Sequence, residues 1–255
     1  MTLEEAIQEV ESRLGKLDAA MTRLIATAYS RLSLSDLQAL LKAALEPRDP
    51  AQRIARLGML MRAWDAEVGK LEGLPADLLR QFPAWVEAAA LDTTVLLTAQ
   101  GVSVGLNLDP ARERAILGTA QERFRVYWVS ETERFRTQVQ ATLLEGLDAG
   151  RGPRQIAREI RERAGVSQVR AVRIARTEMS RARQVATQER HEALGVTEYE
   201  WLHAPQRKGG RQDRPEHVAR NGRVYRYDKP PSGGAPGTEV NCRCSAIPRP
   251  PQEDE

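Results

Sequence analysis

The sequence has few aromatic residues, few cysteines and no long apolar run. Aromatic side chains make up 5% of the 255 residues, so a core must rest on Leu, Val, Ile and Ala, which favours helices. The two cysteines are too few for a disulfide framework. No stretch approaches the roughly 18 apolar residues of a membrane span, and the first residues lack the pattern of a signal peptide. We therefore expect a chain that folds in a cytosol and has no membrane partner.

Motifs of several common enzyme classes are also missing. The patterns GxGxxG, GKS/T and HExxH do not occur, and residues 1–150 contain no His. We therefore expect residues 1–150 to be a scaffold and the chain not to be an enzyme.

Apolar residues at spacings of three and four predict several helices. The first such stripe is Leu3, Ile7, Val10, Leu14, Leu17, Met21, Leu24 and Ala28. Similar segments run from about 51 to 71, from 83 to 100, and from Asp109-Pro110, a cap and first helical residue, to about 147. The first stripe must be buried. We expect a bundle within the chain, and the alternative is a coiled coil between two chains.

Two more helices, 153–164 and 167–194, are predicted on either side of Gly165-Val166-Ser167. This pattern resembles a helix-turn-helix, with inward-facing residues Ile156, Ile160, Val169 and Val172, so a DNA-binding protein is one alternative. The second helix would be much longer than an ordinary recognition helix. We therefore prefer a helical hairpin that leads into a small terminal domain.

After Gly195 the sequence alternates in the manner of strands. Residues 196–202, 223–227 and 242–247 are predicted to be three short strands, with a turn at Asn221-Gly222 and long loops. The predicted fold class is mainly α: a helical amino-terminal region with long helices, followed by a small α+β domain with a long helix and a short antiparallel β-meander. We expect residues 1–150 to form the first part, 151–248 the second, and 249–255 a disordered tail.

The charge of the chain is unevenly distributed. Residues 1–150 hold 17 Lys and Arg against 21 Asp and Glu, whereas residues 151–226 hold 18 against 9. Nearly all of the latter cations are Arg, which can contact phosphates or pair with an acidic protein surface. An ordinary solvated helix face would explain the same pattern.

Most of the residues able to bind a soft metal fall within one short stretch. The chain has three His and two Cys, and four of them lie between positions 203 and 244: His203, His217, Cys242 and Cys244. A Cys-x-Cys in a strand points both sulfurs to one face, and two His could complete a tetrahedral zinc site. The spacing matches no standard zinc finger, so the alternative is a local hydrogen bond from His217 and cysteines packed as small apolar residues. Zinc is the one candidate cofactor.

An ordered set of residues near the carboxyl terminus resembles a known family. The set contains Arg176-Thr177-Glu178, Tyr199, Trp201, Arg214, His217, Asn221-Gly222, Pro236-Gly237, Asn241-Cys242-Arg243-Cys244 and Pro248. Over roughly residues 150–248 it is similar to the carboxy-terminal domain of phage Mu F-like head morphogenesis proteins, also called minor capsid proteins.

This resemblance implies a structural minor head protein of a tailed bacteriophage, located in the head or neck of the virion and assembled in the host cytoplasm. It implies association with the portal protein and with the major capsid or scaffold protein, with residues 1–150 as the docking region. The arginine-rich helices could face packaged double-stranded DNA. The alternative is a metal-dependent nuclease or toxin-like effector carried in the head, using Glu178, His217 and a metal.

Two departures from the family pattern weaken the prediction of zinc. A basic segment, residues 206–212, shifts the usual Asp and Arg out of register, and Glu239-Val240 stands where some relatives have His-Pro. We expect structural roles for the matched residues. Arg176 and Glu178 would pair with Arg214 or bond loop amides, Trp201 would anchor the core, and Gly222 and Gly237 would adopt positive φ.

Overall fold

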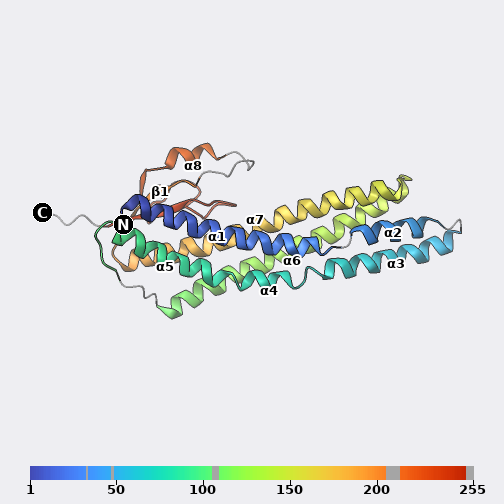
Figure 1. The fold of residues 1–255 in the computed structure, drawn as a ribbon, viewed down its shortest axis with the longest axis horizontal. Coiled ribbons are helices and arrows are strands. Elements are labelled where there is room, and N and C mark those ends of the chain that lie inside the picture. The colour runs from blue at the N-terminus through green and yellow to red at the C-terminus, as the bar shows by residue number, and fades with distance from the viewer. Residues whose placement is uncertain (33, 47–48, 105–108, 205–212, 251–255) are drawn as a thin grey trace. The chain divides into compact units, whose positions relative to one another are not determined.

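The computed structural model describes residues 1–32, 34–46, 49–104, 109–204 and 213–250 (Figure 1). Its helices are α1 (Leu3–Ser30), α2 (Leu34–Leu45), α3 (Pro50–Gly69), α4 (Leu74–Leu79), α5 (Phe82–Thr98), α6 (Pro110–Asp148), α7 (Pro153–Ala193) and α8 (Pro215–Arg220). Its strands are β1 (Glu198–Leu202), β2 (Val224–Arg226) and β3 (Ser245–Arg249). The predicted fold class, long helices followed by a small antiparallel sheet, is confirmed. Among the described helices, none is long and apolar enough to cross a membrane.

The start of α6 shows how local sequence sets a helix boundary. Asp109 accepts a hydrogen bond at 2.9 Å from the backbone N–H of Ala111, which would otherwise lack a partner in the first turn. Pro110 is the first helical residue, as predicted, because its fixed φ suits that position. The short helices α4 and α8 were not predicted, because six residues are too few to show a period.

The predicted break at Gly165-Val166-Ser167 is wrong, because α7 runs without interruption from Pro153 to Ala193. A single glycine inside a helix costs only about 1 kcal/mol relative to alanine. The buried face continues across it through Ile160, Ala164, Ser167 and Ala171. Val169, predicted to face inward, is 59% exposed. The residues expected to form the turn of a helix-turn-helix are therefore helical, and that alternative is excluded here.

The sheet has the order β2-β1-β3, and both pairings are antiparallel. A meander would place the second strand in the centre, so this detail of the prediction is wrong. β1 is central because Glu200 pairs with Val224 on one side and with Ile247 on the other. Along β1, Tyr199 and Trp201 are buried, while the three residues that alternate with them are only partly buried. Arg249, predicted to begin the disordered tail, is the last residue of β3, and residues 251–255 lie outside the described part.

The chain forms two compact units, and neither is continuous in sequence. Unit 1 comprises residues 1–21, 79–124 and 173–255, and unit 2 comprises residues 22–78 and 125–172. The long helices α1, α6 and α7 each contribute residues to both units. The predicted boundary at residue 150 falls between α6 and α7 within unit 2, so the compact units do not follow the predicted division, and separate domains at 1–150 and 151–248 stay a prediction.

Unit 2 has an aromatic core with a buried polar chain beside it. The ring centroid of Phe135 lies 5.6 Å from that of Trp64 and 6.2 Å from that of Tyr29. The Tyr29 hydroxyl lies 2.8 Å from Ser167 Oγ, which donates a hydrogen bond at 3.0 Å to Glu131. Burial raises the pKa of Tyr29 to about 12. Ser167 therefore serves as a hydrogen-bonding residue within α7 and not as a helix cap.

Unit 1 buries the first part of the amino-terminal apolar stripe. Ala6 and Val10 of α1 form a buried cluster with Leu96 of α5 and Ile247 of β3. This part of the stripe thus packs within the chain. Next to β3, the buried carboxylate of Asp92 on α5 accepts hydrogen bonds from Arg183 of α7 at 2.7 and 3.1 Å.

A second arginine and a serine complete this network. Arg13 of α1 pairs with the other Asp92 oxygen, and Arg183 also donates to Ser245 Oγ at 3.3 Å. The two guanidinium groups compensate the buried carboxylate, and the network holds the end of the sheet against the helices of unit 1.

Candidate metal centre

Four side chains from three segments of unit 1 lie near one another. His203 directly follows β1, His217 lies on α8, Cys242 precedes β3 in the chain, and Cys244 is adjacent to its first residue. His217, Cys242 and Cys244 are each 4% exposed, and His203 is partly buried. The structure therefore brings together all four residues that the sequence proposed as metal ligands.

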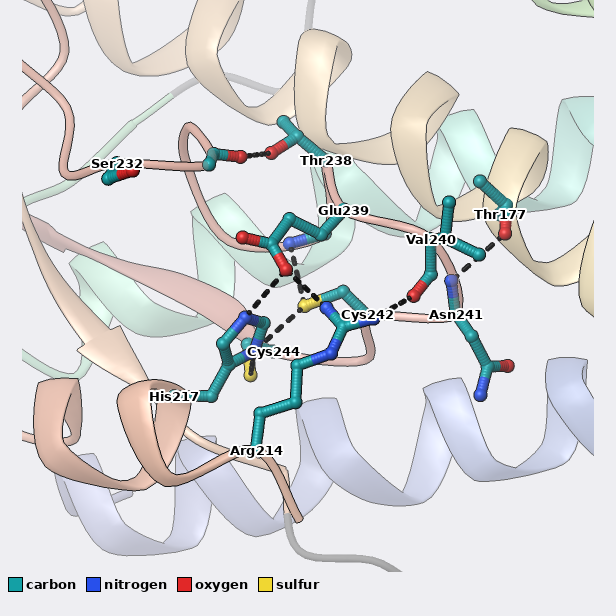
Figure 2. A network of polar contacts seen from close by, with 12 residues as sticks. Thr177, Arg214, His217, Ser232, Thr238, Glu239, Val240, Asn241, Cys242 and Cys244 are labelled. Carbon is teal, nitrogen blue, oxygen red and sulfur yellow. Dashed lines mark hydrogen bonds and ion pairs between the residues drawn. The ribbon is translucent and has the colours of Figure 1, made fainter. Parts of the chain in front are cut away.

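The nitrogen and sulfur atoms of these residues face one another. His217 faces both cysteines (Figure 2), with its Nδ1 3.6 Å from Cys242 Sγ and 3.5 Å from Cys244 Sγ. His203 Nδ1 lies 3.7 Å from Cys244 Sγ. His217, Cys242 and Cys244 form one group whose ligand atoms all lie within 4.8 Å of one another. Such contacts suit either thiol–imidazole hydrogen bonds or a shared cation.

Carboxylates lie behind both imidazoles. Glu239 Oε2 is 3.1 Å from His217 Nε2 and is also paired with Arg214, whose guanidinium donates to the carbonyl of Val240 at 2.7 Å (Figure 2). Asp213 Oδ2 faces His203 Nε2 at 3.5 Å. In the sequence, Glu239 is notable only because Glu239-Val240 stands where some relatives have His-Pro. Its contact with His217 was not predicted, because residue spacing does not show which side of a histidine a loop residue reaches.

The electrostatics of the cluster favour a charged sulfur. A hydrogen bond from Cys244, together with contacts from His217 and the backbone, lowers the pKa of the Cys242 thiol despite its burial. The hydrogen bond with Cys242 raises the pKa of His217, and Glu239 adds to this. The backbone N–H of Gly237 donates to Cys242 Sγ at 3.3 Å. The cluster can therefore hold a thiolate, which is the form of cysteine that binds metals.

A polar brace connects the neighbouring loop to α7. Arg176 donates to Asp18 of α1 at 2.5 and 3.0 Å and to Asn241 Oδ1 at 2.8 Å. Thr177 Oγ1 accepts a hydrogen bond at 2.9 Å from the backbone N–H of Asn241 (Figure 2). Arg176 and Thr177 therefore fix the first residue of Asn-Cys-Arg-Cys, which places the two cysteines.

Glu178 does not share the surroundings of His217. It is 1% exposed and pairs with Arg181 on the same helix at 2.8 Å. The predicted pairing of Glu178 with Arg214 is not found, since Arg214 binds Glu239. Of the two groups of potential metal ligands among the described residues, neither includes Glu178. The hydrolytic site of Glu178, His217 and a metal, considered as an alternative, therefore lacks the required geometry.

The remaining matched residues support the loops. Trp201 is 1% exposed, and its ring meets that of His217 edge to face at 5.3 Å between centroids. Gly222 and Gly237 have φ of 75° and 86°, a region that glycine adopts without strain. A Cβ on Gly237 would lie 3.3 Å from the Ser180 carbonyl oxygen of α7. The basic segment 206–212 lies outside the described residues.

Together these features define a class of protein: a helical scaffold carrying a small, loop-rich α+β domain around a buried His–Cys cluster. Residues 137–247 match the family model described as Phage Mu protein F like protein. The match falls in the family and in the part of the chain that the sequence resemblance predicted. The match supports a bacteriophage protein with a role in head morphogenesis.

An uncharacterized protein of Haemophilus influenzae is similar to part of the chain. The two are 30% identical over 112 residues, which is 44% of this chain and 24% of the relative. The match thus spans about a quarter of that protein's length. No solved structure matches the chain.

Proposed function

We propose that the chain is a structural minor head protein that associates with the portal and the head interior or head–tail connector, and acts in head assembly. The family match over residues 137–247 carries this proposal. The geometry agrees with it, because the polar contacts of Arg176, Thr177 and Arg214 hold loops in place. Contact with the major capsid or scaffold protein belongs to the same proposal.

The proposal includes a contact surface for packaged double-stranded DNA. Arg154, Arg158 and Arg161 of α7 are exposed and, at spacings of four and three, lie on one face of the helix. We call these residues the arginine stripe. Two acidic residues lie beside the stripe: Glu159, which is paired with Arg151 at 2.8 Å, and the exposed Glu162. The stripe still presents a net positive charge to solvent, which suits phosphate contacts without base recognition.

Co-purification with the portal tests the head role. The tagged full-length chain is co-expressed with the portal protein encoded in the same genome and isolated under native conditions. The proposal expects portal rings to be retained. If neither portal nor capsid protein is retained at any salt concentration, the assignment to the head is wrong.

Charge reversal tests the arginine stripe. The variant R154E/R158E/R161E is compared with R23E/R31E/R114E, which reverses three other exposed arginines. Fluorescence anisotropy with duplex DNA over a salt series should show weaker binding for the stripe variant only, with the log–log salt slope reduced by about 0.9 per lost phosphate contact. Normal DNA binding with loss of the portal would instead assign the stripe to an acidic protein surface.

A further inference from the structure

We propose that His203, His217, Cys242 and Cys244 bind one Zn²⁺ ion in a closed, tetrahedral structural site. The site would tie the end of β1, helix α8 and the segment before β3 to one another. This inference does not depend on the role in the head, because it uses only contacts within unit 1.

The spacing of the ligand atoms carries the proposal. A tetrahedral site with Zn–N of about 2.0–2.1 Å and Zn–S of about 2.3 Å has nitrogen–sulfur separations of about 3.6 Å. Three of the four nitrogen–sulfur distances in the cluster are 3.5, 3.6 and 3.7 Å. Three of the proposed ligands, His217, Cys242 and Cys244, already have all their ligand atoms within 4.8 Å of one another. His203 contacts Cys244 alone among them, and it would have to move inward to complete the site.

The orientation of the two imidazoles is a second, independent sign. Both direct Nδ1 to sulfur and Nε2 to a carboxylate, which is Glu239 for His217 and Asp213 for His203. Metal-bound histidines usually donate their remaining ring N–H to a carboxylate or carbonyl, which fixes the tautomer that binds the metal. The N–H of Gly237, directed at Cys242 Sγ at 3.3 Å, would likewise stabilise a bound thiolate.

The kind of metal follows from the donors. Two thiolates and two neutral imidazoles in a tetrahedral arrangement suit Zn²⁺, and the two sulfur charges balance the ion. Four protein ligands leave no open position for a substrate or a water. The site would therefore be structural.

The small domain around the sheet would gain stability from a bound metal ion. Its buried cluster around the sheet consists of Tyr199, Trp201, Tyr227, Ala235, Cys242, Cys244 and Ala246, two of which are the proposed cysteine ligands. Small cores with long connections gain stability from a bound metal, because the ion links segments that have little apolar support. Loss of zinc should therefore loosen the sheet and α8 before it affects unit 2.

Metal analysis of the intact chain tests the site. The full-length protein is produced with zinc in the medium, purified without chelators and measured by inductively coupled plasma mass spectrometry. One zinc per chain is expected. Replacement by Co²⁺ should give the intense visible bands of a tetrahedral site and a thiolate-to-cobalt charge-transfer band. Substoichiometric zinc together with no charge-transfer band after reconstitution would overturn the proposal, whatever the variants do.

Variants locate the metal and test for a closed site. Cys242→Ser with Cys244→Ser should abolish zinc binding, whereas His191→Asn should keep one zinc, because the third histidine binds Tyr227 instead. Circular dichroism establishes that each variant is folded, and a chelator should lower the melting temperature of the wild type and His191→Asn only. Full zinc content in the double cysteine variant would place the metal elsewhere. Full content with unchanged cobalt bands in His203→Ala would contradict the four-ligand site.

Discussion

Arg176 of α7 holds Asp18 of α1 through two hydrogen bonds and Asn241 through a third. Arg176 and Asp18 are 158 positions apart in the sequence. Both are largely shielded from solvent, since their side chains are 15% and 12% exposed. A lysine could keep the charge but could not make the two parallel bonds and the third together. Arg176, together with Thr177, thus positions the loop that carries the cysteines.

Arg176→Lys should lower the free energy of unfolding by about 2 kcal/mol, because Asp18 and Asn241 would lose well-placed donors in a shielded site. Urea unfolding measures this, and a double-mutant cycle with Asp18→Asn should show coupling. The matched control is Arg226→Lys, which alters an equally two-pronged but exposed pair with Asp228 and should change nothing measurable. Equal changes in the free energy of unfolding for the two lysine variants would contradict a stabilising role of the Arg176 contacts.

Asn241 combines a left-handed backbone with a hydrogen-bonding side chain. Among the described residues other than glycine, it alone has a positive φ, at 61°. Asn241→Gly should lose only the bond from Arg176, whereas Asn241→Ala should also bear about 1 kcal/mol of backbone strain. Thermal unfolding should therefore rank wild type above Gly and Gly above Ala. An alanine variant as stable as the glycine variant would show that the backbone there is unstrained.

Two glycines, one inside a helix and one with a positive φ, should respond in opposite ways to replacement by alanine. Gly165 lies inside α7 with open space around its Cα, so Gly165→Ala should raise stability by up to about 1 kcal/mol. Gly237 has φ 86° and approaches the Ser180 carbonyl, so Gly237→Ala should lower it by about 1–3 kcal/mol. Chemical denaturation of both variants provides the comparison. Destabilisation by Gly165→Ala would instead support the turn at Gly165 that the sequence suggested.

His191 should make stability fall in acid. It is fully buried, its Nδ1 lies 2.6 Å from the Tyr227 hydroxyl, and burial, with a contribution from Arg183, lowers its pKa to about 3. The unfolded chain binds the proton more readily, so this contribution is fully present above about pH 6.5 and is lost as pH falls toward 3, by up to about 1.4 kcal/mol per pH unit. The difference between wild type and His191→Asn, followed by urea unfolding against pH, isolates this effect. A constant difference across that range would contradict it.

The sequence predicted well those features that depend on neighbouring residues. Asp109-Pro110 identified the start of α6 and the apolar period identified α1, because both act through the local backbone. Gly165 misled the prediction, since a glycine inside a helix and one that ends it look alike in sequence. The burial of Ile160 and Ala164 decides between them, and burial depends on tertiary packing.

The candidate site was predictable in composition and not in arrangement. His203, His217, Cys242 and Cys244 were distinguished by their rarity elsewhere in the chain, and the structure brings them together. Glu239 could not be recognised, because it reaches His217 only through the folding of two loops. The pairing of Arg176 with Asp18 and the central place of β1 likewise depend on contacts between distant segments.

The central claim is that this chain is a structural component of a phage head. The most direct measurement is quantitative mass spectrometry of gradient-purified heads, assembled from a phage that encodes the full-length chain. The account predicts that the chain migrates with the heads in a low, constant ratio to the portal protein, and that deleting it reduces the yield of filled heads. Complete, infectious heads without the chain, from cells in which it is abundant, would contradict the account.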